Sequence, residues 1–178
     1  MECEMCGSHQ LEETVVEDRQ VMRCQLCGHL QGDDELATEI EKRDRADARG
    51  IDSRIYGLVE SLELVPTFRV EKASAGDLDT LEYPVVFLRL IPGGLVDLEK
   101  FLTCLDMVNR ETQRRWVVEC ALEAGVGLVH LLRPRFWKSV QEINETDITE
   151  ARADLPILAH AVERDVSLGW WRGGDKKS

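Results

Sequence analysis

The chain has 178 residues, of which 43% are hydrophobic and 31% charged, and a formal net charge of −12. These values fit a globular protein with one ordinary domain and a small additional module. No run of about 18 apolar residues is present, and the first residues lack the basic and apolar pattern of an export signal, so we expect a cytoplasmic protein that does not enter a membrane. The acidic charge also argues against binding nucleic acid over the whole surface.

The N-terminal segment contains two matching CxxCG motifs. Cys3 and Cys6 form the first pair, and Cys24 and Cys27 form the second. Two thiolates from each pair can reach one metal ion and complete a closed tetrahedral shell. In a reducing compartment, clustered cysteines indicate metal ligands more often than disulfides. Between the pairs, the runs 13–16 and 20–23 are rich in strand-forming residues and predict a hairpin that turns at 17–19.

These residues resemble the paired knuckles of zinc ribbons, which occur in transcription factors, polymerase subunits, ribosomal proteins and enzymes. The resemblance covers about residues 1–32. It implies a structural Zn²⁺ held by Cys3, Cys6, Cys24 and Cys27 in a β-hairpin module that contacts a partner or another domain.

Iron is the alternative metal, because rubredoxins also bind their metal with two CxxCG turns. Rubredoxin-like sites have aromatic residues packed around the metal, whereas no aromatic residue precedes Tyr56 in this chain. Zinc is therefore favoured. His9 and His29 lie beside the cysteines, but four thiolates already complete the shell, and we expect both histidines to be exposed neighbours.

The rest of the chain predicts an α+β domain. Asp33 or Asp34 can cap a polar helix that ends at Gly50, and we interpret residues 33–50 as a linker between the ribbon (1–32) and an α+β domain (51–178). The patterns of apolar residues predict two to four strands and about five helices in this domain; Gly127–Leu132 could be a third strand or continue a helix. The expected elements are a helix from Asp52 or Ser53, strands around Phe68–Val70 and at Val85–Leu90, a helix capped by Asp97, a helix over 112–124, further helix after Leu132, and a last helix from Asp154 or Pro156.

A basic stretch at 110–138 stands out in this acidic chain. Its cations are candidate contacts for an anion or nucleic acid, which gives a first alternative function. In the competing interpretation, Arg110, Arg114 and Arg115 form the solvent-exposed face of a helix. Trp116 and Trp137 then belong to the core. The candidate contacts are Arg110, Arg114, Arg115, Arg133, Arg135 and Lys138.

Near the C-terminus, Trp170 and Trp171 precede two glycines. These rings either fold back onto the core or dock onto a partner protein. With the ribbon, they favour a protein-binding adaptor, regulator or accessory subunit as the main hypothesis.

An enzyme is the second alternative, with Cys104 or Cys120 acting beside His130. Our default expectation is different: both thiols are buried and inert, and His130 and His160 are core histidines with satisfied hydrogen bonds. The carboxylates at 142, 145, 150 and 154 are expected to form a solvated helical face. No phosphate-binding loop, HExxH helix or serine elbow is present, so no catalytic residue is assigned.

Overall fold

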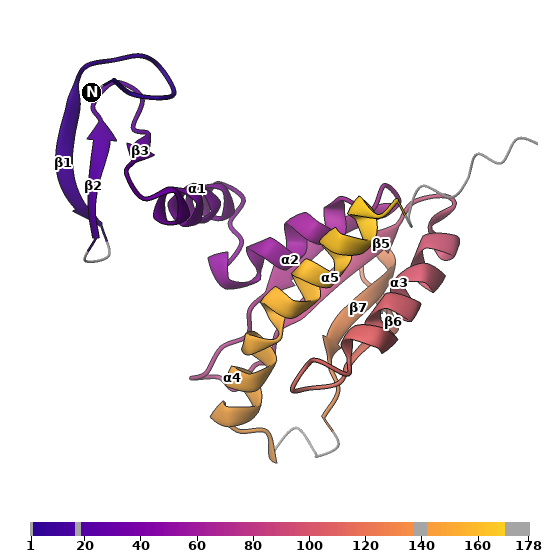
Figure 1. Ribbon diagram of the computed structural model, residues 1–178. Helices are drawn as coiled ribbons and strands as arrows, with labels where there is room; N and C mark the ends of the chain where they lie inside the picture. The colour runs from indigo at the N-terminus through magenta and orange to yellow at the C-terminus, as the bar shows by residue number, and fades with distance from the viewer. Residues whose placement is uncertain (1, 17–18, 137–141, 170–178) are drawn as a thin grey trace, which may run out of the picture. The chain divides into compact units, whose positions relative to one another are not determined.

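The computed structural model describes residues 2–16, 19–136 and 142–169, and it divides the chain into two compact units, Met1–Arg49 and Gly50–Ser178. Together they contain helices and two antiparallel sheets, so the predicted α+β class is confirmed (Figure 1). Among the described residues, no helix combines the length and apolar character needed to cross a bilayer.

The first unit is a small three-stranded sheet followed by one helix. Strands β1 (Leu11–Val16) and β2 (Arg19–Cys24) pair over their whole length, which confirms the predicted hairpin. A short third strand, β3 (Leu30–Gln31), pairs with β2. Helix α1 (Asp34–Ala48) begins where Asp33 accepts a hydrogen bond from the backbone N–H of Leu36, so the expected cap is also correct.

The second unit is a four-stranded sheet covered by helices, with the strand order β4-β5-β7-β6. The strands run Phe68–Ser74 (β4), Val85–Leu90 (β5), Trp116–Glu123 (β6) and Gly127–Pro134 (β7). The helices run Ser53–Glu63 (α2), Gly94–Val108 (α3), Glu145–Ala153 (α4) and Leu155–Ser167 (α5).

One face of this sheet forms the core. Because residues paired across antiparallel strands share a face, Val86 and Leu132 point to the same side, as do Phe68 and Leu90. The inward side chains pack in one buried cluster with residues of α2, α3 and α5. The other face carries ion pairs between neighbouring strands, such as Arg133 with Glu119.

The expected helix over 112–124 is wrong, because residues 116–123 form strand β6. Trp116, Val118, Cys120 and Leu122 alternate on one face, and each pairs with a residue of β7. Gly125 and Gly127 both have positive φ, so they form the hairpin turn to β7 rather than a helix end. Gly127–Leu132 is confirmed as a strand.

Asp97 is not the cap of α3. The helix begins at Gly94, and Asp97 lies in its first turn, where its carboxylate accepts a hydrogen bond from Thr67 at 2.7 Å. The start of α5 is as predicted, with Asp154 in the capping position and Pro156 in the first turn.

Candidate metal centre

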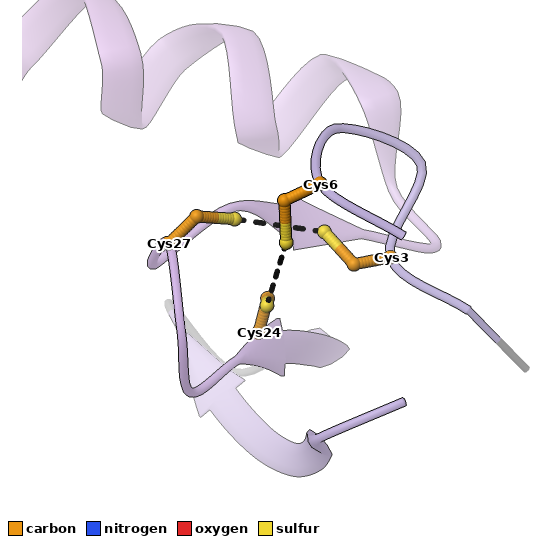
Figure 2. A group of neighbouring side chains, drawn as sticks. All are labelled: Cys3, Cys6, Cys24 and Cys27. Atoms are coloured by element: carbon orange, nitrogen blue, oxygen red, sulfur yellow. Dashed lines mark hydrogen bonds between the residues drawn. The ribbon is translucent and has the colours of Figure 1, made fainter. Parts of the chain in front are cut away.

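The four N-terminal cysteines converge in the first unit, and their sulfurs all lie within 4.8 Å of one another (Figure 2). The Sγ atoms of Cys3 and Cys27 are 3.6 Å apart, as are those of Cys6 and Cys24. A tetrahedral zinc site with Zn–S bonds of about 2.3 Å has sulfurs about 3.8 Å apart. Four free thiols in this arrangement could hold one metal ion.

The two turns that carry the cysteines have the same backbone structure. In each turn the glycine N–H donates to the carbonyl of the first cysteine, Gly7 to Cys3 and Gly28 to Cys24, both at 2.8 Å. The first cysteine N–H of each turn is also bonded, to the carbonyl of Ser8 or His29. In both turns the first cysteine is buried and the second is exposed. The repeated CxxCG sequence therefore folds as two equivalent halves of one site.

Backbone N–H groups point at the sulfurs, as four clustered thiolates require. The N–H groups of Cys27 and Leu26 donate to the Cys24 sulfur and lower the pKa of that thiol to about 6. Those of Ser8 and His29 donate to Cys6 and Cys27. These bonds offset the negative charge that four thiolates would leave around a divalent ion.

Cys6 and Cys24 differ in how readily their thiols ionise. The Ser8 N–H lowers the pKa of Cys6, but hydrogen bonds with the neighbouring thiols and desolvation outweigh it and raise the value to about 12. The pKa of Cys24 is therefore lowered while that of Cys6 is raised, because the neighbouring thiols share hydrogen bonds in which one sulfur keeps its proton. A divalent cation at the centre would stabilise all four thiolates, and the donor set fits zinc.

A buried glutamine, which sequence reasoning missed, ties the third strand to the first turn. Gln31 is 5% exposed; its Oε1 accepts from the Glu4 N–H at 3.2 Å, and its Nε2 donates to the Glu2 carbonyl at 3.3 Å. The side chain thus fixes the chain on both sides of Cys3. The sequence around Gln31 gives no indication that its side chain has this role.

The histidines near the cluster are not among the converging residues. His9 is exposed and lies 3.4 Å from a Glu2 carboxylate oxygen, and His29 lies 3.9 Å from Glu41. His29 is partly buried, with a side chain that is 19% exposed, rather than the exposed neighbour that we expected.

Replacing a turn glycine should weaken metal binding. Gly28 has φ +78°, a conformation that costs an L side chain about 1 kcal/mol, although an added Cβ would meet open space. We expect Gly28→Ala to bind zinc roughly fivefold more weakly in competition with a chromophoric chelator. Gly125→Ala carries the same strain in the other unit and should leave the competition unchanged. Equal weakening by both variants would contradict the role given to Gly28.

The described basic candidates lie in the second unit, and carboxylates already pair with several of them, including Arg115 with Asp106 at 3.9 Å. Arg114 binds Asp147 at 2.7 Å and also Glu150, and Arg133 binds Glu119 at 2.6 Å. Arg110, Arg114 and Arg115 lie in the connection between α3 and β6, not on a helix. A backbone bond of 2.7 Å from Arg135 to Arg115 brings these two positions together.

The basic candidate Lys138 and the two candidate docking residues, Trp170 and Trp171, lie outside the described residues. Trp137 also lies outside them. Trp116 is in the core as expected, at 1% exposure.

Asp154 does not lie on the solvated helical face that we expected. It is fully buried, not solvated, and accepts hydrogen bonds from the backbone N–H groups of Gln113 and Arg114 and from the indole of Trp116. This one carboxylate joins the start of α5 to the segment that enters β6.

The two remaining thiols differ from each other. Cys104 is buried, as expected, and desolvation together with Asp165 raises its pKa to about 12. Cys120 is exposed, contrary to expectation, because it lies on the edge strand β6. Cys120 and His130 are opposite one another in the register, but no hydrogen bond joins them in the described part of the chain.

Brief treatment with iodoacetamide at neutral pH should therefore label Cys120 and leave Cys104 unmodified. Peptide mass spectrometry of the folded, zinc-loaded protein would measure this, with urea-unfolded protein as the control in which both thiols react. Rapid labelling of Cys104 in the folded protein would show that the α3 side of the core opens.

The histidines outside the metal unit also depart from expectation. His160 is exposed on α5. His130 is buried at 5% exposure, but its Nδ1 has no hydrogen-bond partner among the described residues, so it is not a satisfied core histidine.

Comparisons with known proteins give no match: no family model, no curated protein and no solved structure is significantly similar to this chain. The cysteine cluster and the folds of the two units are therefore the basis for assigning a function.

Proposed function

We propose that the N-terminal unit is a zinc-ribbon module with a structural Zn²⁺ bound by Cys3, Cys6, Cys24 and Cys27. In this proposal residues 1–32 form the ribbon, 33–50 link it to the domain at 51–178, and the chain acts as a protein-binding adaptor, regulator or accessory subunit. The ion would supply no chemistry of its own, because four thiolates leave no open coordination position.

The observation that supports protein binding is a pair of exposed apolar side chains at the metal turns. Met5 is 71% exposed and Leu26 is 70% exposed. They occupy equivalent positions, each directly before the second cysteine of its turn. The hydrogen bonds of the turns fix the backbone at both positions, so the two apolar side chains stay exposed to water at a cost that a partner surface would recover.

The charge of the unit indicates what kind of partner fits. Residues 1–49 contain 13 acidic and 6 basic side chains and no aromatic residue. Stacking on nucleic-acid bases therefore has no platform in this unit, and phosphates would be repelled. An apolar protein pocket with a basic rim is complementary to Met5, Leu26 and the acidic surroundings.

A capture experiment from the native cell tests this function. The intact chain should retain a partner that Met5→Glu/Leu26→Glu loses while still binding one zinc ion. The matched control, Leu122→Glu/Leu168→Glu, changes two equally exposed residues of the other unit and should keep the partner. If zinc-loaded Met5→Glu/Leu26→Glu still retained the same partner, docking at Met5 and Leu26 would be refuted.

A further inference from the structure

An apolar recess in the second unit has one polar side chain, His130, among the described residues that line it. The recess has a volume of about 390 Å³ and lies where β5 leads into α3, beside the start of β7. Its walls are Leu90, Ile91, Pro92, Gly93, Gly94, Leu95 and Leu128. Leu95 and Leu128 at its rim are 73% and 55% exposed, so apolar surface extends from the recess to the solvent.

One nitrogen of His130, Nδ1, lacks the hydrogen bond that a buried imidazole nitrogen normally makes. His130 is 5% exposed, and its Nδ1 is sealed from water without a partner among the described residues. An unsatisfied buried polar group destabilises a fold unless another molecule supplies the missing partner. Because the imidazole lines the recess, rotation about its Cβ–Cγ bond can present an N–H to a bound acceptor.

The first turn of α3 lies in the wall of the same recess. This helix of 15 residues begins after Gly93, which has φ +91° and provides no side-chain cap. The first N–H groups of a helix have no acceptor within the helix, and the helix dipole favours negative charge there. The Gly94 N–H already donates to the Ile91 carbonyl at 2.9 Å and the Val96 N–H to the Gly93 carbonyl at 3.4 Å, which leaves the Leu95 N–H available to an acceptor in the recess. An added Cβ at Gly93 would meet open space, so an acceptor can approach the backbone closely.

The lining also determines which anion fits. No lysine or arginine is among the described residues that line the recess, so within this lining a phosphate dianion would lack the cations that neutralise it. The nearest acidic group of the helix, Asp97, is already bonded to Thr67 at 2.7 Å and to Lys100 at 3.5 Å. A carboxylate requires only a few N–H donors, and the leucine-rich walls suit an apolar body.

We infer that this recess binds a small organic acid, with its carboxylate at His130 and the first turn of α3 and its apolar body between Leu90, Leu95 and Leu128. The volume is at the lower end for ligand pockets and fits a molecule of about ten non-hydrogen atoms. This site is independent of the metal centre and adds a ligand to the proposed binding role of the chain.

Phenylacetate is a suitable probe, and nuclear magnetic resonance of the full-length, zinc-loaded protein is the measurement. Phenylacetate at concentrations up to about 10 mM should give saturable shifts of the His130 ring signals and of the Gly93, Gly94 and Leu95 amides. The exposed His160 ring and the Gly125 amide are internal controls that should not move. Acetate, which lacks the apolar body, and phenylacetamide, which lacks the charge, should each bind at least about tenfold more weakly.

The variant His130→Leu separates binding from folding, because leucine removes the unsatisfied nitrogen and should keep the sheet folded. We expect it to retain the amide spectrum of the unit and to bind phenylacetate at least about tenfold more weakly. The inference is overturned if phenylacetate gives no saturable shift at these signals. It is also overturned if phenylacetamide binds equally well, or if folded His130→Leu binds phenylacetate unchanged.

Discussion

Removal of the metal should unfold residues 1–49 and leave residues 50–178 folded. Structural zinc contributes on the order of 10–16 kcal/mol to folding in modules of this kind. A unit this small buries few large side chains, chiefly Val21 and Leu36 beside Cys3 and Cys24, so its apolar core cannot replace that energy. The second unit has its own continuous core and contains none of the four clustered cysteines.

Hydrogen–deuterium exchange followed by mass spectrometry would measure this prediction in one sample. After treatment with a strong chelator, the β1, β2 and β3 amides should exchange at the rate of an unfolded peptide, while those of β5 and β7 should keep their protection. Added zinc should restore protection in the first unit. Unchanged protection of β1 and β2 in metal-free protein would show that the sheet does not depend on the ion.

Replacing Asp154 should strongly destabilise the second unit. Its side chain is fully buried and accepts three hydrogen bonds, at 2.7 Å from Gln113, 2.9 Å from Arg114 and 3.1 Å from the Trp116 indole. Asp154→Ala leaves all three donors without a partner and opens a cavity beside Trp116. We expect a loss of about 3–5 kcal/mol in the free energy of unfolding.

Urea unfolding monitored by far-ultraviolet circular dichroism would measure this loss, with zinc present throughout so that the first unit stays folded. Asp106→Asn is the control, because Asp106 is exposed and its only described ion pair, to Arg115, is 3.9 Å long. That variant should change stability by less than about 0.5 kcal/mol. Equal effects of the two variants would mean that the Asp154 hydrogen bonds do not stabilise the contact between the start of α5 and the segment that precedes β6.

Much of the local structure could be predicted because its signals lie close together in the sequence. The repeated CxxCG motif predicted the cysteine cluster, and the strand-forming runs between its two copies predicted the hairpin. Asp33 and Pro156 similarly mark the starts of α1 and α5 by their capping and first-turn chemistry. The hairpin and the two helix starts depend on residues only a few positions apart, whereas the cysteine cluster could be predicted because the same CxxCG motif occurs twice.

Strand β6 was missed because its sequence satisfies two periodicities. Trp116, Val117, Cys120 and Ala121 recur at helical spacing, whereas Trp116, Val118, Cys120 and Leu122 alternate as in a strand. Pairing with β7 decides between them, and that pairing involves the whole hairpin. The adjacent valines and the Gly125–Gly127 turn are the local signals that favoured a strand.

The roles of Asp154, Gln31 and His130 could not be predicted for a related reason. Asp154 has its partners about 40 positions away, and Gln31 bonds to residues 27 and 29 positions earlier. A surface carboxylate, a polar loop residue and a satisfied histidine are the ordinary interpretations of these residue types. Only the tertiary structure shows which polar groups are buried and whether each has a partner.

The central claim is that one zinc ion holds the four cysteines together, and the metal content of the purified chain tests it most directly. Elemental analysis combined with native mass spectrometry should find one zinc per intact chain and none in Cys24→Ser/Cys27→Ser. An intact chain that contains no stoichiometric metal and still has a protected β1–β2 hairpin would contradict the account.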